Sequence, residues 1–280
     1  MKKSIALGSF DGLHRGHIAV LEKASRENFE RLILDINFPK SGGKSTAGTL
    51  ITQSQKQLLL ENLCFTPAAV SFSEIKNLTP EEFFSEYLIK KFGVSLISCG
   101  SNFTFGINRS GNVDTLLSLA EKYGVELAVA DDTLYQGELI SSTRIRGAII
   151  SGDIGAANDM LGRPFSYDFT VVNGNKIGRT LGFPTINQLF CDNFTIPKHG
   201  VYLSQITLDG KKYRGLTSIG SRPTFDKPEI RSETYIHGFS GNLYGQNVPV
   251  EILSFVRPVI KFASKEELTQ QINKDLEQIK

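Results

Sequence analysis

Two histidines and three glycines fall within ten residues near the start of the chain. Residues 8–17 read GSFDGLHRGH, between an expected strand (4–7) and an expected helix (16–26). Glycines let the backbone turn sharply beside a ligand, and a helix N-terminus offers free N–H groups and a positive dipole end. Two of the four histidines of the chain lie here, which favours a phosphate site over an ordinary turn with solvated histidines.

A second polar segment, residues 140–146 (ISSTRIR), follows the last expected strand of the first half and opens a helix. By itself it could be a capped helix start with two solvated arginines. In this order, however, the two segments resemble the His-x-Gly-His and Ser-Ser-Thr-x-x-Arg motifs of the nucleotidyltransferase superfamily. That resemblance implies in-line attack of a substrate phosphate on the α-phosphorus of ATP, with His14, His17 and Arg146 neutralising the growing charge.

The second half contains another dense group of turn-forming residues, 178–187 (GRTLGFPTIN). It ends in Thr185 and Asn187, whose side-chain oxygens are hard ligands suited to Mg²⁺ and phosphate oxygens. Further along, Glu233 lies in an expected strand. Each feature alone is equally consistent with a plain β-turn, or with a strand carboxylate paired to a cation such as Arg231.

The order of these segments resembles the riboflavin kinase domain. The matching segments are 178–187, Gly-Val-Tyr at 200–202, Ile-Gly-Ser-Arg-Pro-Thr-Phe at 219–225, and Glu233 followed by Leu-Tyr-Gly at 243–245. From residue 3 to 279, the whole sequence resembles the bacterial bifunctional riboflavin kinase/FMN adenylyltransferase (FAD synthetase) family. The resemblance implies that ATP phosphorylates riboflavin to FMN and adenylylates FMN to FAD, releasing ADP and pyrophosphate.

The resemblance also assigns roles to individual residues. It implies catalysis by His14, His17, Arg146 and Glu233, the last as the base that takes a proton from the ribityl hydroxyl of riboflavin. For the nucleotide it implies Gly8, Ser9, Phe10, Asp11, Gly12, Gly16, Ser141, Ser142, Thr143, Gly178 and Arg179. For the flavin it implies Asn102, Phe103, Phe105, Tyr202 and Arg222, and for Mg²⁺, bound with ATP, it implies Thr185 and Asn187.

One departure from the family pattern keeps two alternatives open. Asn102 stands where the pattern of residues 100–106 has Asp, so a negative charge is absent from the expected FMN site. The first alternative is a riboflavin kinase whose adenylyltransferase is weak or inactive. The second is a flavin-binding regulatory protein without chemistry, which the retained His17, Thr185 and Glu233 argue against.

The elements that must position these residues change character near residue 162. The first half alternates strands (4–7, 31–36, 67–72, 94–99, 125–130) with helices (16–26, 52–63, 80–93, 114–123), which predicts an α/β, Rossmann-like parallel sheet covered by helices. Thr79 and Glu82 predict a capping box at the start of the third of these helices. The second half has successive strands (167–172, 200–208, 212–219, 233–239, 248–256) and a final helix, which predicts a small antiparallel β-barrel. Asp209-Gly210 predicts a hairpin turn between two of these strands. We therefore expect domains at 1–162 and 163–280.

Composition limits the class of protein. Hydrophobic residues make up 40% and the net charge is +2, so the chain lacks the basic excess of a general nucleic-acid binder. No stretch approaches the apolar length of a membrane span, and the first residues predict a strand rather than a signal peptide. Three widely spaced cysteines exclude a disulfide framework and indicate buried free thiols. We expect a cytoplasmic enzyme that binds only small molecules, of unknown oligomeric state.

Overall fold

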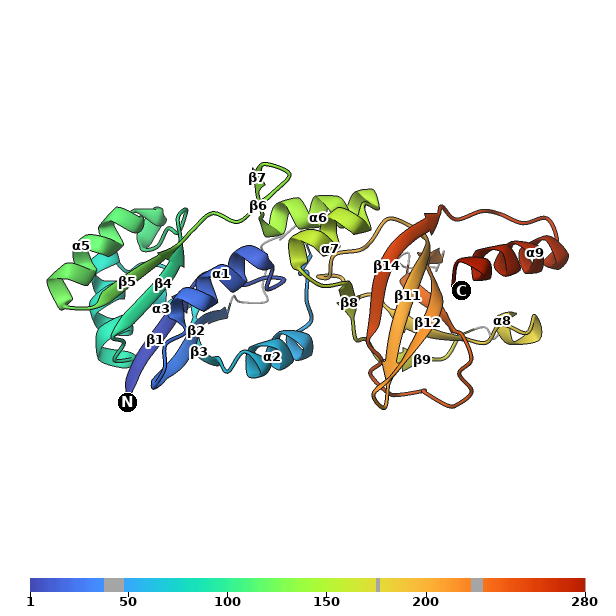
Figure 1. Ribbon diagram of the computed structural model, residues 1–280, viewed down its shortest axis with the longest axis horizontal. Helices are drawn as coiled ribbons and strands as arrows, with labels where there is room; N and C mark the ends of the chain where they lie inside the picture. Colours follow the sequence, from blue (N-terminus) through green and yellow to red (C-terminus); the bar gives the residue numbers. More distant parts are fainter. Residues whose placement is uncertain (38–47, 175–176, 223–228, 280) are drawn as a thin grey trace. The chain divides into compact units, whose positions relative to one another are not determined.

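The computed structural model describes residues 1–37, 48–174, 177–222 and 229–279 (Figure 1). Packing divides them into two compact units: the described residues of Met1–Lys44 with Lys56–Ser141, and those of Ser45–Gln55 with Ser142–Lys280. The predicted α/β class and the predicted barrel are both confirmed. The predicted boundary after residue 162 differs from the division by packing, and stays a prediction about where independent folding begins.

The first unit is built on a parallel sheet of five strands in the order β3-β2-β1-β4-β5 (Figure 1). The strands are β1 (Lys2–Leu7), β2 (Phe29–Asn37), β3 (Thr66–Ser71), β4 (Leu96–Gly100) and β5 (Glu126–Ala130). Around the sheet lie α1 (Arg15–Ala24), α2 (Gln53–Asn62), α3 (Phe72–Ile75), α4 (Pro80–Glu82), the π-helix η1 (Phe83–Lys91), the 3₁₀ turn η2 (Ile107–Arg109) and α5 (Val113–Tyr123). A small hairpin follows, β6 (Leu134–Tyr135) with β7 (Glu138–Leu139).

The core of this unit explains the sequence pattern of its strands. Ile5 on β1 pairs with Leu32 on one side and Ile97 on the other, and all three side chains are buried. Strands with helices on both faces are apolar throughout rather than alternating. The predicted capping box at Thr79 and Glu82 is present: each backbone N–H donates to the other's side-chain oxygen, at 2.8 and 3.2 Å.

The second unit is a barrel whose strands run in the order β8-β14-β11-β12-β13-β10-β9. They are β8 (Phe165–Tyr167), β9 (Val171–Val172), β10 (Thr185–Leu189), β11 (Gly200–Leu208), β12 (Lys211–Arg222), β13 (Glu229–Ile236) and β14 (Val250–Arg257). The two end strands, β8 and β9, are separated in the chain only by residues 168–170, so the sheet closes on itself. The predicted Asp209-Gly210 hairpin turn has positive φ at both residues, 48° and 76°, as a type I′ turn requires.

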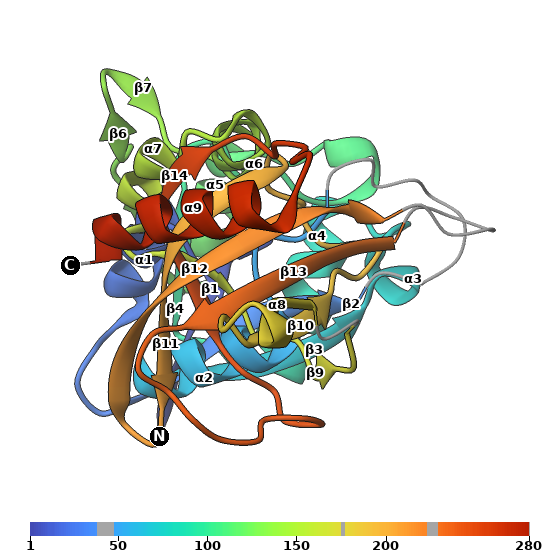
Figure 2. The same cartoon turned by 90° about the vertical axis from the view of Figure 1, so that its right-hand side faces the viewer.

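Helices and the segment of residues 48–55, which we call the strap, complete the second unit. The helices are α6 (Ser142–Ser151), α7 (Ile154–Leu161), α8 (Ile177–Thr180), α9 (Lys265–Leu276) and the 3₁₀ turn η3 (Glu277–Ile279), and Figure 2 shows α9 along the outside of the barrel. The Asn158 amide of α7 donates to the Ile252 carbonyl at 3.0 Å, and its oxygen accepts from the Phe165 N–H at 2.7 Å. Residues 48–55 also belong here, since Thr52 donates to Asp168 at 2.5 Å.

Two sequence-based expectations concern the cysteines and the membrane. Cys99 is a buried thiol as expected, and burial raises its pKa to about 11. Cys64 and Cys191 are exposed, so the expectation of buried thiols was wrong for them: both lie in connecting segments outside the cores. Within the described ranges, none of the helices has the length and apolar character needed to span a bilayer.

The packing of α7 generates a test of the domain boundary. A fragment of residues 163–280 lacks the Asn158 hydrogen bonds and the buried side chains of Ile154, Met160 and Leu161, whereas 142–280 keeps them. Both lack residues 48–55, which makes them a matched pair. We expect the shorter fragment to melt at least about 8 °C lower, since each kcal/mol corresponds to about 4 °C in a domain of this size. Equal melting temperatures by circular dichroism would instead support autonomy from residue 163.

Candidate functional sites

The turn between β1 and α1 reverses the chain through an unusual backbone. Phe10, Gly12 and Leu13 all have positive φ, 49°, 82° and 42°. Left-handed conformations are costly for residues with a side chain, and here the side chains of Phe10 and Leu13 are fully buried, which holds them in place. Strained backbone fixed by burial is typical of ligand-binding turns. Gly8 is also constrained, because a Cβ there would lie 3.2 Å from the Phe10 ring.

His14 and His17 form a stacked pair at the N-terminus of α1. His14 is the N-cap, and its Nδ1 accepts the His17 backbone N–H at 3.3 Å. Because Nδ1 is the acceptor, the neutral ring carries its proton on Nε2. The ring centroids are 3.6 Å apart, and a Cβ on Gly16 would lie 3.2 Å from the His14 ring. The structure therefore brings together His14, His17 and Gly16, three of the predicted residues, at a helix N-terminus.

The loop after β4 lies at the same edge of the sheet, because β4 runs parallel to β1 beside it. Asn102 is exposed there and Phe103 is half-buried. Phe105 lies in the hydrophobic core against Phe83, so it supports the loop from below instead of offering its ring to a ligand. Sequence reasoning missed Asp132, which follows β5 and accepts the Ser101 hydroxyl at 2.5 Å; its position directly after a strand was the available signal.

The polar segment of residues 141–146 is divided between the two compact units. Ser141 belongs to the first unit, whereas Ser142 and Thr143 begin α6 in the second unit. The Arg146 Nε donates to the Gly48 carbonyl at 2.7 Å, and that oxygen also accepts the Thr195 hydroxyl at 2.9 Å. In this structure the predicted catalytic arginine therefore holds the strap of residues 48–55 within its own unit.

A row of polar side chains crosses the outer face of the barrel. Asn187 on β10 lies opposite Glu233 on β13, and Glu233 lies opposite Ser218 on β12. Directly opposed residues of a sheet share a face. The intervening Ser232 and Thr234 are fully buried on the inner face. Thr185 lies two residues from Asn187 and therefore faces outward as well.

The Asn187 amide is buried in a cradle beside Glu233. Its side chain is only 6% exposed, and within the described ranges Oδ1 has no hydrogen-bond partner. A Cβ on Gly174 would lie 2.5 Å from Nδ2, so only glycine fits where the next segment passes over it. A buried oxygen without a donor calls for a ligand. Amide and hydroxyl oxygens are ligands that Mg²⁺ accepts, so Asn187 and Thr185 fit a divalent cation.

The loop at 178–183 folds back onto this face. The Phe183 N–H donates to the Gly178 carbonyl at 2.8 Å, and a Cβ on Gly178 would lie 2.4 Å from the Phe183 carbonyl oxygen. The Phe183 ring meets Tyr235 edge-on at 5.7 Å, and Arg179 is exposed at the end of α8. The predicted residues of this loop therefore gather beside Thr185, which lies opposite Tyr235.

Two predicted flavin-binding residues, Tyr202 and Arg222, are not among the described side chains of this outer face. Tyr202 is fully buried inside the barrel, where its hydroxyl donates to the Lys198 carbonyl and burial raises its pKa. Its ring is thus part of the core, and the sequence could not distinguish this position from an outward one. Arg222 ends β12, and its side chain, like residues 223–225, lies outside the described part. Arg231, the cation considered above as a partner of Glu233, forms an ion pair with Glu229.

Comparisons with known proteins match the two halves of the chain to two different families. The FAD synthetase family model matches residues 1–144, and the riboflavin kinase family model matches residues 161–280. A bifunctional riboflavin kinase/FMN adenylyltransferase from Buchnera aphidicola subsp. Schizaphis graminum is 32% identical, covering 99% of this chain and 93% of the relative. One from Listeria monocytogenes is 31% identical, over 98% and 90%. A solved structure named as a macrolide-efflux protein from Streptococcus pneumoniae has a TM-score of 0.90 at 29% identity, covering 99% and 93%.

The cradle around Asn187 can be tested by adding a single methyl group. Gly174→Ala places a Cβ against the buried Asn187 amide, and we expect a loss of about 1–3 kcal/mol of stability in urea denaturation, as in other overpacked sites. Gly155→Ala in α7 is the control, since its nearest neighbour would be 3.9 Å away. If both variants have the stability of the parent protein, the cradle is not as tight as described.

Proposed function

Since the chain belongs to the bacterial bifunctional riboflavin kinase/FMN adenylyltransferase family, it makes FMN and FAD from riboflavin and ATP, and we propose which of its residues do so. The family, both activities and their small-molecule substrates and products agree with the sequence-based predictions. A family model matches each half of the chain, which favours the bifunctional enzyme over a riboflavin kinase with a weak or inactive adenylyltransferase and over a flavin-binding regulatory protein. We further propose a cytoplasmic location, which the three free cysteines support, since reducing compartments keep thiols unpaired.

The proposed kinase site is the outer face of the barrel between β10 and β13. The observation that carries it is the direct opposition of Glu233 and the buried Asn187, whose Oδ1 has no hydrogen-bond partner among the described residues. In the proposal Glu233 accepts the proton of the ribityl hydroxyl, because a primary alcohol is a poor nucleophile near neutral pH. Thr185 and Asn187 would hold Mg²⁺ with ATP; a bound cation neutralises charge on the phosphates.

The proposed nucleotide and flavin contacts of the kinase surround that pair of residues. The loop containing Gly178 and Arg179 folds beside Thr185, which places backbone N–H groups and an exposed cation where phosphates would lie. Arg222 is retained as a proposed flavin residue, since its strand, β12, is the neighbour of β13 on the side away from β10. Tyr202 is not included, because its buried ring belongs to the core.

The proposed adenylyltransferase site is the turn between β1 and α1. The FMN phosphate attacks the α-phosphorus of ATP in line, so the protein must position two anions and stabilise the charge that grows between them. His14 caps α1 with its Nε2 carrying the proton of the neutral ring, and His17 stacks on it at the positive end of the helix dipole. Arg146 remains the proposed third cation, and Asn102 and Phe103 the proposed FMN contacts.

The base assignment predicts a selective loss of turnover. Glu233→Gln keeps the shape and removes the proton acceptor, so we expect single-turnover phosphorylation to fall by about 10²-fold or more while riboflavin still binds. Glu229→Gln is the control, because it removes another carboxylate of β13, one that forms an ion pair with Arg231. An unchanged rate in Glu233→Gln, or an equal loss in both variants, contradicts the assignment.

The two-site proposal predicts that the activities separate. His17→Ala should lower FAD formation from supplied FMN by about 10²-fold, since it removes a stacked imidazole from the charge-neutralising end of α1. Riboflavin phosphorylation in the same variant should stay close to the parent rate. The exposed His199 provides the control variant His199→Ala. Parallel loss of both reactions, resolved by chromatography of the three flavins, would refute two separate sites.

A further inference from the structure

The Gly48 carbonyl oxygen in the strap accepts two hydrogen bonds. One comes from Arg146 Nε at 2.7 Å, and the other comes from the Thr195 hydroxyl at 2.9 Å. A carbonyl oxygen has two lone pairs, so these two donors use its full capacity. Thr195 is only 2% exposed, whereas Arg146 on α6 is half-buried. The arginine that the family resemblance assigns to adenylyl transfer is thus bonded to a group that the barrel unit holds.

The barrel fixes the direction of that carbonyl through the peptide group to which it belongs. The N–H of the same peptide, that of Thr49, donates to the Asn193 carbonyl at 2.7 Å, and the Thr49 carbonyl accepts the Thr195 N–H at 2.9 Å. Because a peptide group is planar and trans, an N–H that is held on one side directs the C=O to the opposite side. The direction of the Gly48 oxygen therefore depends on this pairing of the strap with the barrel.

The strap approaches the barrel so closely at residue 48 that only glycine fits. A Cβ there would lie 2.2 Å from the carbonyl carbon of Phe194 and 2.5 Å from the Thr195 nitrogen, both main-chain atoms. Phe194 is itself fixed, because it is 4% exposed and its ring lies 5.1 Å from Phe169 and 5.8 Å from Phe165. The segment that receives the strap is therefore anchored in the core of the barrel.

The far end of the strap is held on the same unit by a single carboxylate. Thr52 and Ser54 donate to the two oxygens of Asp168, each at 2.5 Å. Between the two attachments, the side chains of Leu50 and Ile51 are buried. Since both ends are attached and the middle is buried, the strap cannot slide along the barrel, and the carbonyl at its start is a fixed point for the guanidinium.

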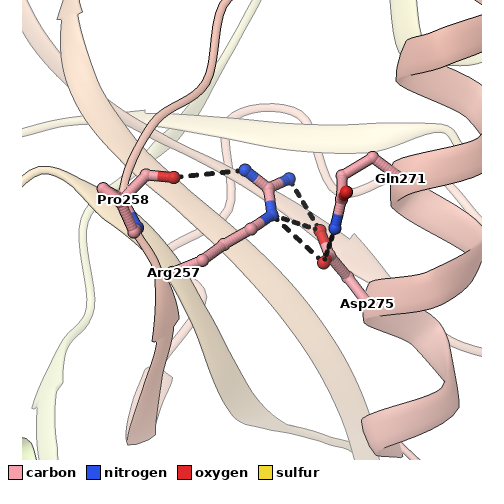
Figure 3. A network of polar contacts seen from close by, with 4 residues as sticks. All are labelled: Arg257, Pro258, Gln271 and Asp275. Atoms are coloured by element: carbon pink, nitrogen blue, oxygen red, sulfur yellow. Dashed lines mark hydrogen bonds and ion pairs between the residues drawn. The ribbon is translucent and has the colours of Figure 1, made fainter.

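The acceptor that orients Arg146 is neutral, which distinguishes this bond from the one at Arg257 in the same unit. Arg257 donates from Nε and Nη2 to the carboxylate of Asp275, at 2.7 to 3.1 Å (Figure 3). A carboxylate orients a guanidinium and also cancels its charge, whereas a peptide carbonyl orients it and leaves the charge in place. Because a guanidinium is a rigid plane of five donors, fixing Nε also sets the direction of its terminal nitrogens. Such a bond suits an arginine that must meet a phosphate.

We propose that Thr195 is a positioning residue of the adenylyltransferase, acting through the Gly48 carbonyl to orient Arg146 for the charge that grows on the α-phosphate. The inference rests on the proposed function of Arg146 in that reaction. Neither Thr195 nor Gly48 touches a reacting atom, so both act through the guanidinium. A buried residue of the barrel unit thereby contributes to FAD formation without being one of the residues proposed for riboflavin phosphorylation.

The test is steady-state kinetics of the full chain. Thr195→Val removes the hydroxyl and keeps the shape, so we expect kcat for FAD formation from supplied FMN to fall about fivefold to tenfold. KM for FMN and ATP should stay at parent values, because the affected charge grows only in the transition state. Thr195→Ser keeps the hydroxyl and should recover most of the rate. Thr170→Val, which removes an exposed hydroxyl bonded to Asn247, is the control.

A double-mutant cycle separates positioning from folding. In an Arg146→Gln background, Thr195→Val should cost nothing further in kcat, because residues that act through one another are not additive. Riboflavin phosphorylation and the melting temperature report the state of the barrel, and both should stay close to the parent values in Thr195→Val.

The proposal is overturned if Thr195→Val leaves kcat for FAD formation unchanged, if it lowers kcat by the same factor in both backgrounds, or if both activities and the melting temperature fall together. Failure of Thr195→Ser to recover the rate contradicts it as well. Full FAD formation in Arg146→Gln would count against the proposed function of Arg146 itself, whatever the Thr195 variants show.

Discussion

The register of β13 determines which chemistry the barrel can do. Strand residues alternate between faces, so a slip by one position would turn Glu233 inward and replace it with Ser232 or Thr234. The inner face opposes such a slip, since the Thr217 hydroxyl bonds with Thr234 at 2.9 Å and donates to Ser204 at 2.8 Å. Buried polar groups that are satisfied only in one arrangement penalise every other arrangement. The outward row is thus specified from inside the barrel.

The first unit meets the same requirement by different means. Its ligand-facing groups lie in turns, which have no ladder of hydrogen bonds to fix them. Instead, the buried side chains of Phe10 and Leu13 hold the turn after β1 in a left-handed backbone, and the His14 cap fixes where α1 begins. Both units therefore place their polar groups by anchoring the residues directly beside them, so substitutions at the neighbours should affect catalysis as well as stability.

Local patterns predicted most of the fold and a part of each site. Strand and helix alternation, the capping residues and the Asp-Gly turn depend on near neighbours, and the structure contains them. Residues 185–187 were interpreted as the end of a ligand-bearing turn, although they begin strand β10, because the pairing of β10 with β13 is distant in sequence. The inward direction of Tyr202, the attachment of residues 48–55 to the second unit and the Arg257–Asp275 pair likewise depend on contacts between distant residues that no local spacing reveals.

The closure of the barrel through residues 165–172 has a consequence for self-association. Sheets with open edges recruit strands from other chains and aggregate. Here one continuous segment pairs with β14 through β8 and with β10 through β9, so its neighbours on both sides have their ladder groups engaged. At the bend between them, the Gln188 amide donates to the Phe169 carbonyl at 2.5 Å and to the Val248 carbonyl at 2.8 Å. The buried amide of one glutamine thus engages two carbonyl oxygens at this bend, which leaves them less available to a strand from another molecule.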